Sequence, residues 1–138
     1  MKSPQFTGTE VVKFGLMPAG MTLPVRNAGR TPGFITESRR GWVWSDDLPE
    51  QPNYEGLELF TLQFPLSADT VFELGTGQLP PPQPLTKPGR EHFSLFYYGY
   101  IAYADIFQKQ HRTGFCWRIF FRHGNAVYYG GAPYNYYT

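Results

Sequence analysis

The sequence predicts an all-β protein, a single-domain antiparallel β-sandwich that is immunoglobulin-like in the broad sense of two packed sheets. Aromatic residues form 18% of the 138 residues, and charged residues only 17%. The chain has 15 glycines and 13 prolines, and such a composition is typical of many short strands joined by turns. No window has a sustained helical period of apolar residues, so we expect under about a tenth of the chain in helices. A small closed β-barrel is the alternative fold.

The strongest strand signal is the stretch 94–121, which we interpret as a long β-hairpin. In its second half the odd positions from His111 to Phe121 are mostly aromatic or apolar. The even positions from Arg112 to Arg122 include three arginines. This alternation indicates a strand that packs one face on a core and turns its other face to water.

The register of this hairpin follows from the position of its tip. The residues between the two runs are polar at 108–110, so we expect a three-residue tip that pairs Phe107 with His111. Ile101 then faces Trp117. The positions in each pair must keep the same parity, because a slip of one residue would turn every core side chain to the outer face.

Shorter strands are expected on both sides of the hairpin. They are 10–14, 21–27, 34–44 with an interruption at 39–41, 57–64, 70–74 and 126–129. Pro24 removes a hydrogen-bond donor, which places its strand at a sheet edge or at a bulge. Residues 46–56 are expected to form a loop. The stretch 75–90 contains five prolines and is expected to be a rigid, extended crossover.

Three segments are expected along the chain: a loose lead-in at 1–9, the sandwich at 10–129, and a tyrosine-rich tail at 130–138. The tail either folds back over a sheet edge or contributes to a recognition surface formed by Tyr128, Tyr129, Tyr134, Tyr136 and Tyr137. The single cysteine, Cys116, excludes an intrachain disulfide, and we expect a slowly reacting thiol within the sheet. The net charge of +1 argues against specific nucleic-acid binding. The chain has no apolar run of about 18 residues, so we expect no transmembrane segment in it.

Two stretches carry a resemblance to known proteins. Residues 25–33 contain the pattern N-x-G-x-T-P, and residues 99–116 contain Y-x-D-I-F followed, after a short gap, by H-x-T-x-F-C. In these motifs the chain resembles a group of uncharacterised bacterial proteins in which N-terminal membrane helices precede a β-rich domain of about this length. The resemblance implies a β-rich domain that is associated with a membrane through a segment outside this chain. Gln108 departs from the pattern, since a glycine often follows the D-I-F motif there.

We expect no enzymatic activity, cofactor or metal site. His92, His111 and His123 lie far apart in the sequence, whereas metal ligands must converge. Cys116 and His111 have an odd spacing, which puts them on opposite faces of one strand and separates a thiol from its base. The acidic residues of 46–58 are expected to lie on a solvated loop, and the chain has no nucleotide-binding glycine motif.

The best candidate ligand site is an aromatic and basic surface. Arg112, Arg118 and Arg122 share one strand face, and Tyr98 and Tyr100 come from the neighbouring strand. Guanidinium groups over tyrosine rings suit anions, nucleotides or sugars. The same pattern also fits an outer face that only keeps the sheet solvated.

We therefore expect a non-catalytic binding or interaction module for a protein partner or a small anionic ligand. A sensor of a nucleotide or other anion and a carbohydrate-binding domain are the alternatives. An apolar cavity with converging arginines would favour the sensor. A shallow groove of exposed Trp and Tyr would favour the carbohydrate-binding domain, and a flat apolar patch would favour a protein partner.

Overall fold

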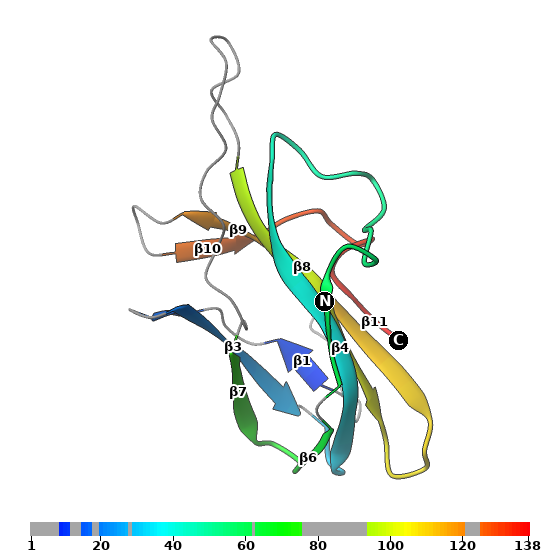
Figure 1. The fold of residues 1–138 in the computed structure, drawn as a ribbon. Coiled ribbons are helices and arrows are strands. Elements are labelled where there is room, and N and C mark those ends of the chain that lie inside the picture. Colours follow the sequence, from blue (N-terminus) through cyan, green and yellow to red (C-terminus); the bar gives the residue numbers. More distant parts are fainter. Residues whose placement is uncertain are drawn as a thin grey trace, which may run out of the picture.

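The computed structural model describes residues 9–11, 15–17, 20–27, 29–61, 63–75, 94–120 and 125–138. Across these ranges the chain is all-β, without a helix, and its strands form two antiparallel sheets that pack together (Figure 1). The prediction of an antiparallel β-sandwich is confirmed. The described strands do not close into a barrel.

The smaller sheet is built around β3. It contains β1 (Thr9–Val11), β2 (Gly15–Met17), β3 (Gly20–Asn27) and β7 (Val71–Gly75). Strands β1 and β2 pair with successive parts of β3, and β7 pairs with the opposite edge of β3. Pro24 therefore lies in an interior strand, and the expectation of an edge position is wrong. Pro24 falls between the stretches that pair with β1 and β2, where the register shifts by one residue, so its missing N–H lies at an irregularity of the ladder.

The larger sheet contains the other strands. They are β4 (Gly33–Ser45), β5 (Glu58–Phe60), β6 (Phe64–Leu66), β8 (Ser94–Ala104), β9 (Gln110–Phe120), β10 (Asn125–Tyr128) and β11 (Tyr136–Tyr137). The order is β10-β9-β8-β4-β5, with β11 next to β9 and β6 next to β4. The tail thus covers an edge of β9, as expected.

Two expected strands differ from the observed ones. Strand β4 runs without interruption through 39–41, because each of these residues pairs with β8; its irregularity is a bulge at Thr36. The expected strand 57–64 is divided into β5 and β6, and β6 continues through Pro65 to Leu66. The expected crossover at 75–90 lies outside the described residues, apart from Gly75.

In the β8–β9 hairpin, odd-numbered residues pair with odd-numbered residues as expected, but the register differs from the expected one. Ile101 pairs with Thr113 instead of Trp117, and Trp117 pairs with Tyr97. The last pair is Ala104 with Gln110, so the tip is five residues long, 105–109. The expected three-residue tip is wrong because Asp105, which was assigned to a strand, belongs to the turn.

Asp105 closes this turn through its backbone and its side chain. Its C=O accepts the N–H of Gln108 at 2.9 Å, and its N–H donates to the C=O of Lys109 at 3.0 Å. Its Oδ1 accepts the N–H groups of Phe107 and Lys109 at 2.8 and 3.0 Å. Gln108 has a φ of 63°, the left-handed position of a turn with a bulge that glycine usually fills.

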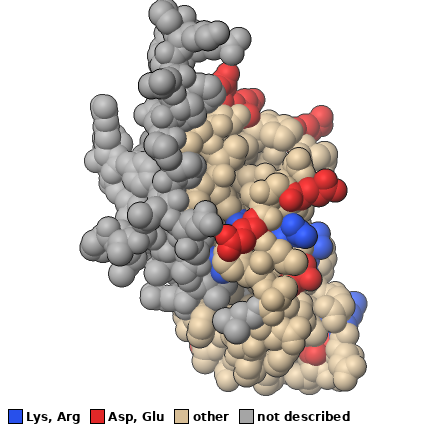
Figure 2. All heavy atoms as spheres, viewed as in Figure 1, with Lys and Arg blue, Asp and Glu red and all other residues tan. Residues whose placement is uncertain are grey.

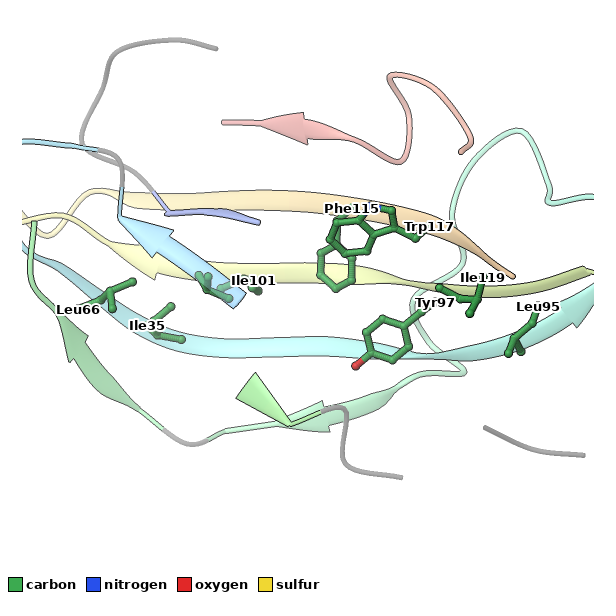
Figure 3. Packing of buried hydrophobic residues seen from close by; sticks show 9 residues of the cluster. Ile35, Leu66, Leu95, Tyr97, Ile101, Phe115, Trp117 and Ile119 are labelled. Atoms are coloured by element: carbon green, nitrogen blue, oxygen red, sulfur yellow. The ribbon is translucent and has the colours of Figure 1, made fainter. Parts of the chain in front are cut away.

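The main core lies between the two sheets. Its buried side chains come mostly from the odd positions of β8 and β9 and point into the space between the layers (Figure 3). They are Val25, Ile35, Leu66, Leu95, Tyr97, Ile101, Phe115, Trp117 and Ile119. Gly99 sits in the same stripe, and a Cβ there would lie 2.0 Å from the C=O of Arg39. The glycine is therefore needed for the close approach of β8 to β4.

The outer face of the larger sheet carries a second, smaller core. Phe96, Tyr98 and Cys116 are buried there beneath the loop 46–57 and the segment that ends in β11. The expectation that this face meets water is wrong. A strand pattern shows which side chains share a face, but whether a distant loop covers that face depends on tertiary packing.

Candidate binding surfaces at the edge of the larger sheet

The chain between β10 and β11 forms a loop that Asn135 holds against the edge of β9. The Asn135 side chain accepts the N–H of Cys116 at 3.0 Å through Oδ1. Its Nδ2 donates to the C=O groups of Tyr129 and Gly131 at 2.8 and 3.1 Å. The N–H of Tyr129 in turn donates to the C=O of Cys116 at 3.1 Å. One amide side chain thus joins both arms of the loop to β9.

This loop borders a groove of about 620 Å³ at the edge of the sheet. We call it the tyrosine groove, because four tyrosines line it. The lining residues are Thr113, Gly114, Phe115, Tyr128, Tyr129, Gly130, Gly131, Asn135, Tyr136 and Tyr137. None of these described lining residues is charged. Gly130 and Gly131 have φ values of 88° and 65°, which turn the chain sharply at the rim.

Two of the tyrosines present much of their surface to solvent. Tyr128 is 62% exposed and Tyr137 is 36% exposed. The Tyr128 ring stacks on Trp117 with centroids 5.4 Å apart, so its orientation is supported by the core. Tyrosine rings held in this way provide contact area with little loss of conformational entropy on binding.

Tyr136 forms the wall between the groove and the outer face of the sheet. Its ring lies directly over Gly114, where a Cβ would come within 2.2 Å of the ring. Its hydroxyl group is 3.0 Å from the hydroxyl group of Tyr54. Burial is the main cause that raises the pKa of Tyr54, and the bond to Tyr136 adds to it. The hydroxyl group of Tyr54 therefore stays protonated over the ordinary pH range.

Tyrosine hydroxyl groups also attach the loop 46–57 to the outer face and to the C-terminal segment. These bonds are Tyr98 to the C=O of Asn53 (2.7 Å), Tyr129 to Oδ1 of Asp47 (2.8 Å) and Tyr134 to the C=O of Pro49 (2.6 Å). The bond from Tyr129 lowers the pKa of Asp47, and burial raises the pKa of Tyr134 to about 12. The groove is therefore bordered by chain that is tied down on several sides.

The five residues of the predicted aromatic and basic surface do not form one site among the described residues. Arg112 lies with its Cζ 3.8 Å above the ring of Tyr100. Tyr98 is buried under the loop, Arg118 is half-buried, and Arg122 lies outside the described residues. On this face the C-terminal segment covers the positions between Arg112 and Arg118. Of this set, the structure places Arg112 on the ring of Tyr100, and ligand binding by the five residues stays a prediction.

A second groove of about 490 Å³ lies next to Arg112 and carries charges of both signs. Its described lining residues are Thr36, Glu37, Ala102, Gln110, His111, Arg112, Tyr136 and Thr138. Glu37 accepts a hydrogen bond from the Tyr100 hydroxyl group at 2.7 Å. This carboxylate beside Arg112 offsets the positive charge that an anion would need.

His111 and Asp105 are joined by a hydrogen bond at the hairpin tip. Nε2 of His111 lies 2.9 Å from Oδ2 of Asp105, and Nδ1 lies 2.8 Å from the main-chain oxygen of Thr138. The hydrogen bond from His111 is the main cause that lowers the pKa of Asp105. His111 thus joins the tip of the hairpin to the end of the tail.

Cys116 is buried and unbridged, and burial raises the pKa of its thiol to about 12, so the thiolate is scarce near neutral pH. His, Cys, Asp and Glu do not gather in threes among the described residues in a way that could hold a metal ion. The same residues include no helix long and apolar enough to cross a membrane.

The sequence alone did not point to Asn135, which builds the tyrosine groove. Asn and Asp side chains commonly bond to nearby backbone amides in turns, which was the available signal. Comparison of the chain with protein-family models, curated proteins and solved structures gives no match. The fold and the surfaces described above define a β-sandwich with an uncharged aromatic groove at the edge of its larger sheet.

Proposed function

We propose that this chain is a non-catalytic binding module that takes an uncharged saccharide in the tyrosine groove. The observation that carries the proposal is a groove of about 620 Å³ with four tyrosines and no charged residue in its described lining. A shallow groove of exposed aromatic residues is the feature expected of a carbohydrate-binding domain. Such sites are lined mainly by apolar and aromatic groups with a few polar groups that fix orientation.

The chemistry of the groove supports a sugar more than an anion. A pyranose ring has an apolar C–H face that packs on an aromatic ring, and Tyr128 and Tyr137 are the exposed rings here. Tyrosine hydroxyl groups both donate and accept hydrogen bonds, which suits the hydroxyl groups at the rim of a sugar. A nucleotide would bring negative charge into a groove whose described lining has no cation.

The anion sensor is the second candidate, and the stacked pair of Arg112 and Tyr100 supports it. That pair lies across Tyr136 from the tyrosine groove, beside Glu37. The motifs shared with bacterial proteins that carry N-terminal membrane helices support a further part of the proposal. The module then belongs to a membrane-associated protein and is attached through a segment outside this chain.

The test is binding to neutral oligosaccharides with glucose, galactose or N-acetylglucosamine units, compared with binding to nucleotides and inorganic phosphate. We expect at least one oligosaccharide to bind, and Tyr128→Ala and Tyr137→Ala each to weaken binding about tenfold, as truncation of a central tyrosine often does. Val71→Ala, an exposed change on β7, is the matched control and should leave the affinity unchanged.

Two results would contradict the saccharide proposal. In the first, no oligosaccharide binds, a nucleotide or phosphate does bind, and Arg112→Gln abolishes that binding. The anion sensor would then replace the saccharide-binding module as the proposed function. The second is oligosaccharide binding that both tyrosine variants retain at full strength, which would place the site elsewhere on the chain.

A further inference from the structure

The tip of the β8–β9 hairpin presents two adjacent apolar side chains to solvent. Phe107 is 82% exposed and Ile106 is 52% exposed, and they occupy the two central positions of the turn that Asp105 and Gln108 close. Turn positions of this kind usually hold small or polar residues. Large apolar residues there leave surface in water that a different turn sequence would avoid.

The tip holds these side chains in a fixed frame. The carboxylate of Asp105 accepts the N–H groups of Phe107 and Lys109, and its other oxygen pairs with His111. The backbone of the turn is therefore hydrogen-bonded although the side chains at its centre contact little protein. A preformed turn loses little conformational entropy when its side chains are buried by another surface.

The exposed charged side chain of the tip is the cation of Lys109. The side chain of Asp105 is only 9% exposed and is paired with His111, whereas Lys109 is exposed. A third apolar side chain extends the surface, because Phe34 is exposed and its residue pairs with Ala104, next to the turn. The hairpin projects at the lower right of Figure 1, and this end of the molecule is mostly uncharged in Figure 2.

We infer that this tip inserts into the boundary between headgroups and acyl chains of an anionic lipid bilayer. Phe107 and Ile106 enter the apolar layer, and Lys109 stays among the anionic headgroups. A stable protein interface needs roughly 800 Å² from each partner, which a two-residue projection does not supply. A lipid bilayer does not need so large a preformed contact area, because lipid molecules rearrange around an inserted side chain. The inference is independent of the tyrosine groove.

The experiment is sedimentation of the chain with two kinds of vesicles, phosphatidylcholine mixed with phosphatidylserine and phosphatidylcholine alone. We expect the chain to bind the mixed vesicles more strongly than the neutral ones. The double variant Ile106→Ser/Phe107→Ser should bind the mixed vesicles at least about tenfold more weakly, since it removes most of the inserted apolar area. Lys109→Glu should weaken binding to the mixed vesicles only.

A matched control removes two exposed apolar side chains elsewhere, Leu59 and Val71. The double variant Leu59→Ser/Val71→Ser should bind the mixed vesicles as the unchanged chain does. In Phe107→Trp, vesicles should shift the additional tryptophan emission to shorter wavelength, and brominated lipids should quench it. Thermal melting of each variant shows that it is folded.

Several outcomes would overturn the inference. One is a chain that binds neither kind of vesicle, and another is a tip variant that binds as well as the unchanged chain. A third is a chain that forms dimers by sedimentation velocity while Ile106→Ser/Phe107→Ser is monomeric, because the tip would then be a protein contact. Loss of vesicle binding in the Leu59 and Val71 control would also place the contact elsewhere.

Discussion

Replacement of Asn135 by alanine tests whether one side chain builds the edge of the groove. The change removes the acceptor of the Cys116 N–H and the donor to the C=O groups of Tyr129 and Gly131. A partly buried N–H left without a partner costs about 1–3 kcal/mol, and the two lost donor bonds add about 1 kcal/mol in all. Gly131 contributes little to this sum, since its C=O keeps the N–H of Tyr134. We expect a loss of about 2–4 kcal/mol in the free energy of unfolding.

The assay is urea denaturation, in which the midpoint should fall while the slope with urea stays the same. Saccharide binding should also weaken in Asn135→Ala, because the loop that bears Tyr129 and the glycines would no longer be held to β9. A loss below about 1 kcal/mol, which is less than one unsatisfied buried N–H, would refute this reasoning about the loop.

Asn135→Asp separates the acceptor role of the side chain from its donor role. The new carboxylate can still accept the N–H of Cys116. It has no hydrogen to donate to the C=O groups of Tyr129 and Gly131. The repulsion between these groups raises the pKa of the new carboxyl group above its unfolded value, so the variant should gain stability as the pH falls. A variant as stable as the unchanged chain at neutral pH would show that the two donor bonds contribute nothing.

The remaining predictions concern stability and reactivity. Gly99→Ala should lower the free energy of unfolding, measured by urea denaturation, by about 3 kcal/mol or prevent folding, because the new Cβ would meet the backbone of β4. Gly56→Ala is the control and should be nearly neutral, since a Cβ there meets nothing within 4 Å. Cys116 should react with a thiol reagent only as fast as the chain opens, because burial raises its pKa to about 12; rapid labelling of the folded chain at neutral pH would contradict this. The His111 bond lowers the pKa of Asp105 below 3.8, so its contribution to stability is present above that pH and lost below it. Asp105→Asn should therefore flatten the acid side of the stability curve, and an unchanged curve would show that the pair contributes nothing.

The alternation in β9 determined one part of the core from the sequence alone. Phe115, Trp117 and Ile119 were expected on one face, and all three are buried between the sheets. The pairing of odd-numbered with odd-numbered residues in the hairpin also followed from the sequence, because the side-chain period of two is a local property of an extended chain. The position of the tip was wrong, since the count of polar residues placed Asp105 in a strand, whereas it lies in the turn whose amides it accepts.

Other features depended on contacts between segments far apart in the chain. Arg112 and Arg118 share a strand face in the sequence pattern, but the C-terminal segment covers the residues between them. The tyrosine groove exists because Asn135 reaches Cys116, which is 19 positions away in the chain. No local pattern specifies such a bond.

The sequence by itself determined the class of fold, the parity of the long strands and the absence of a disulfide. These follow from composition, from the period of two along a strand and from the presence of one cysteine. Only the tertiary structure decided which face is covered, which tyrosines are exposed and where the groove lies. Burial and hydrogen bonding are properties of the packed chain, and the loop 46–57 and the C-terminal segment both pack on a sheet whose strands lie elsewhere in the sequence.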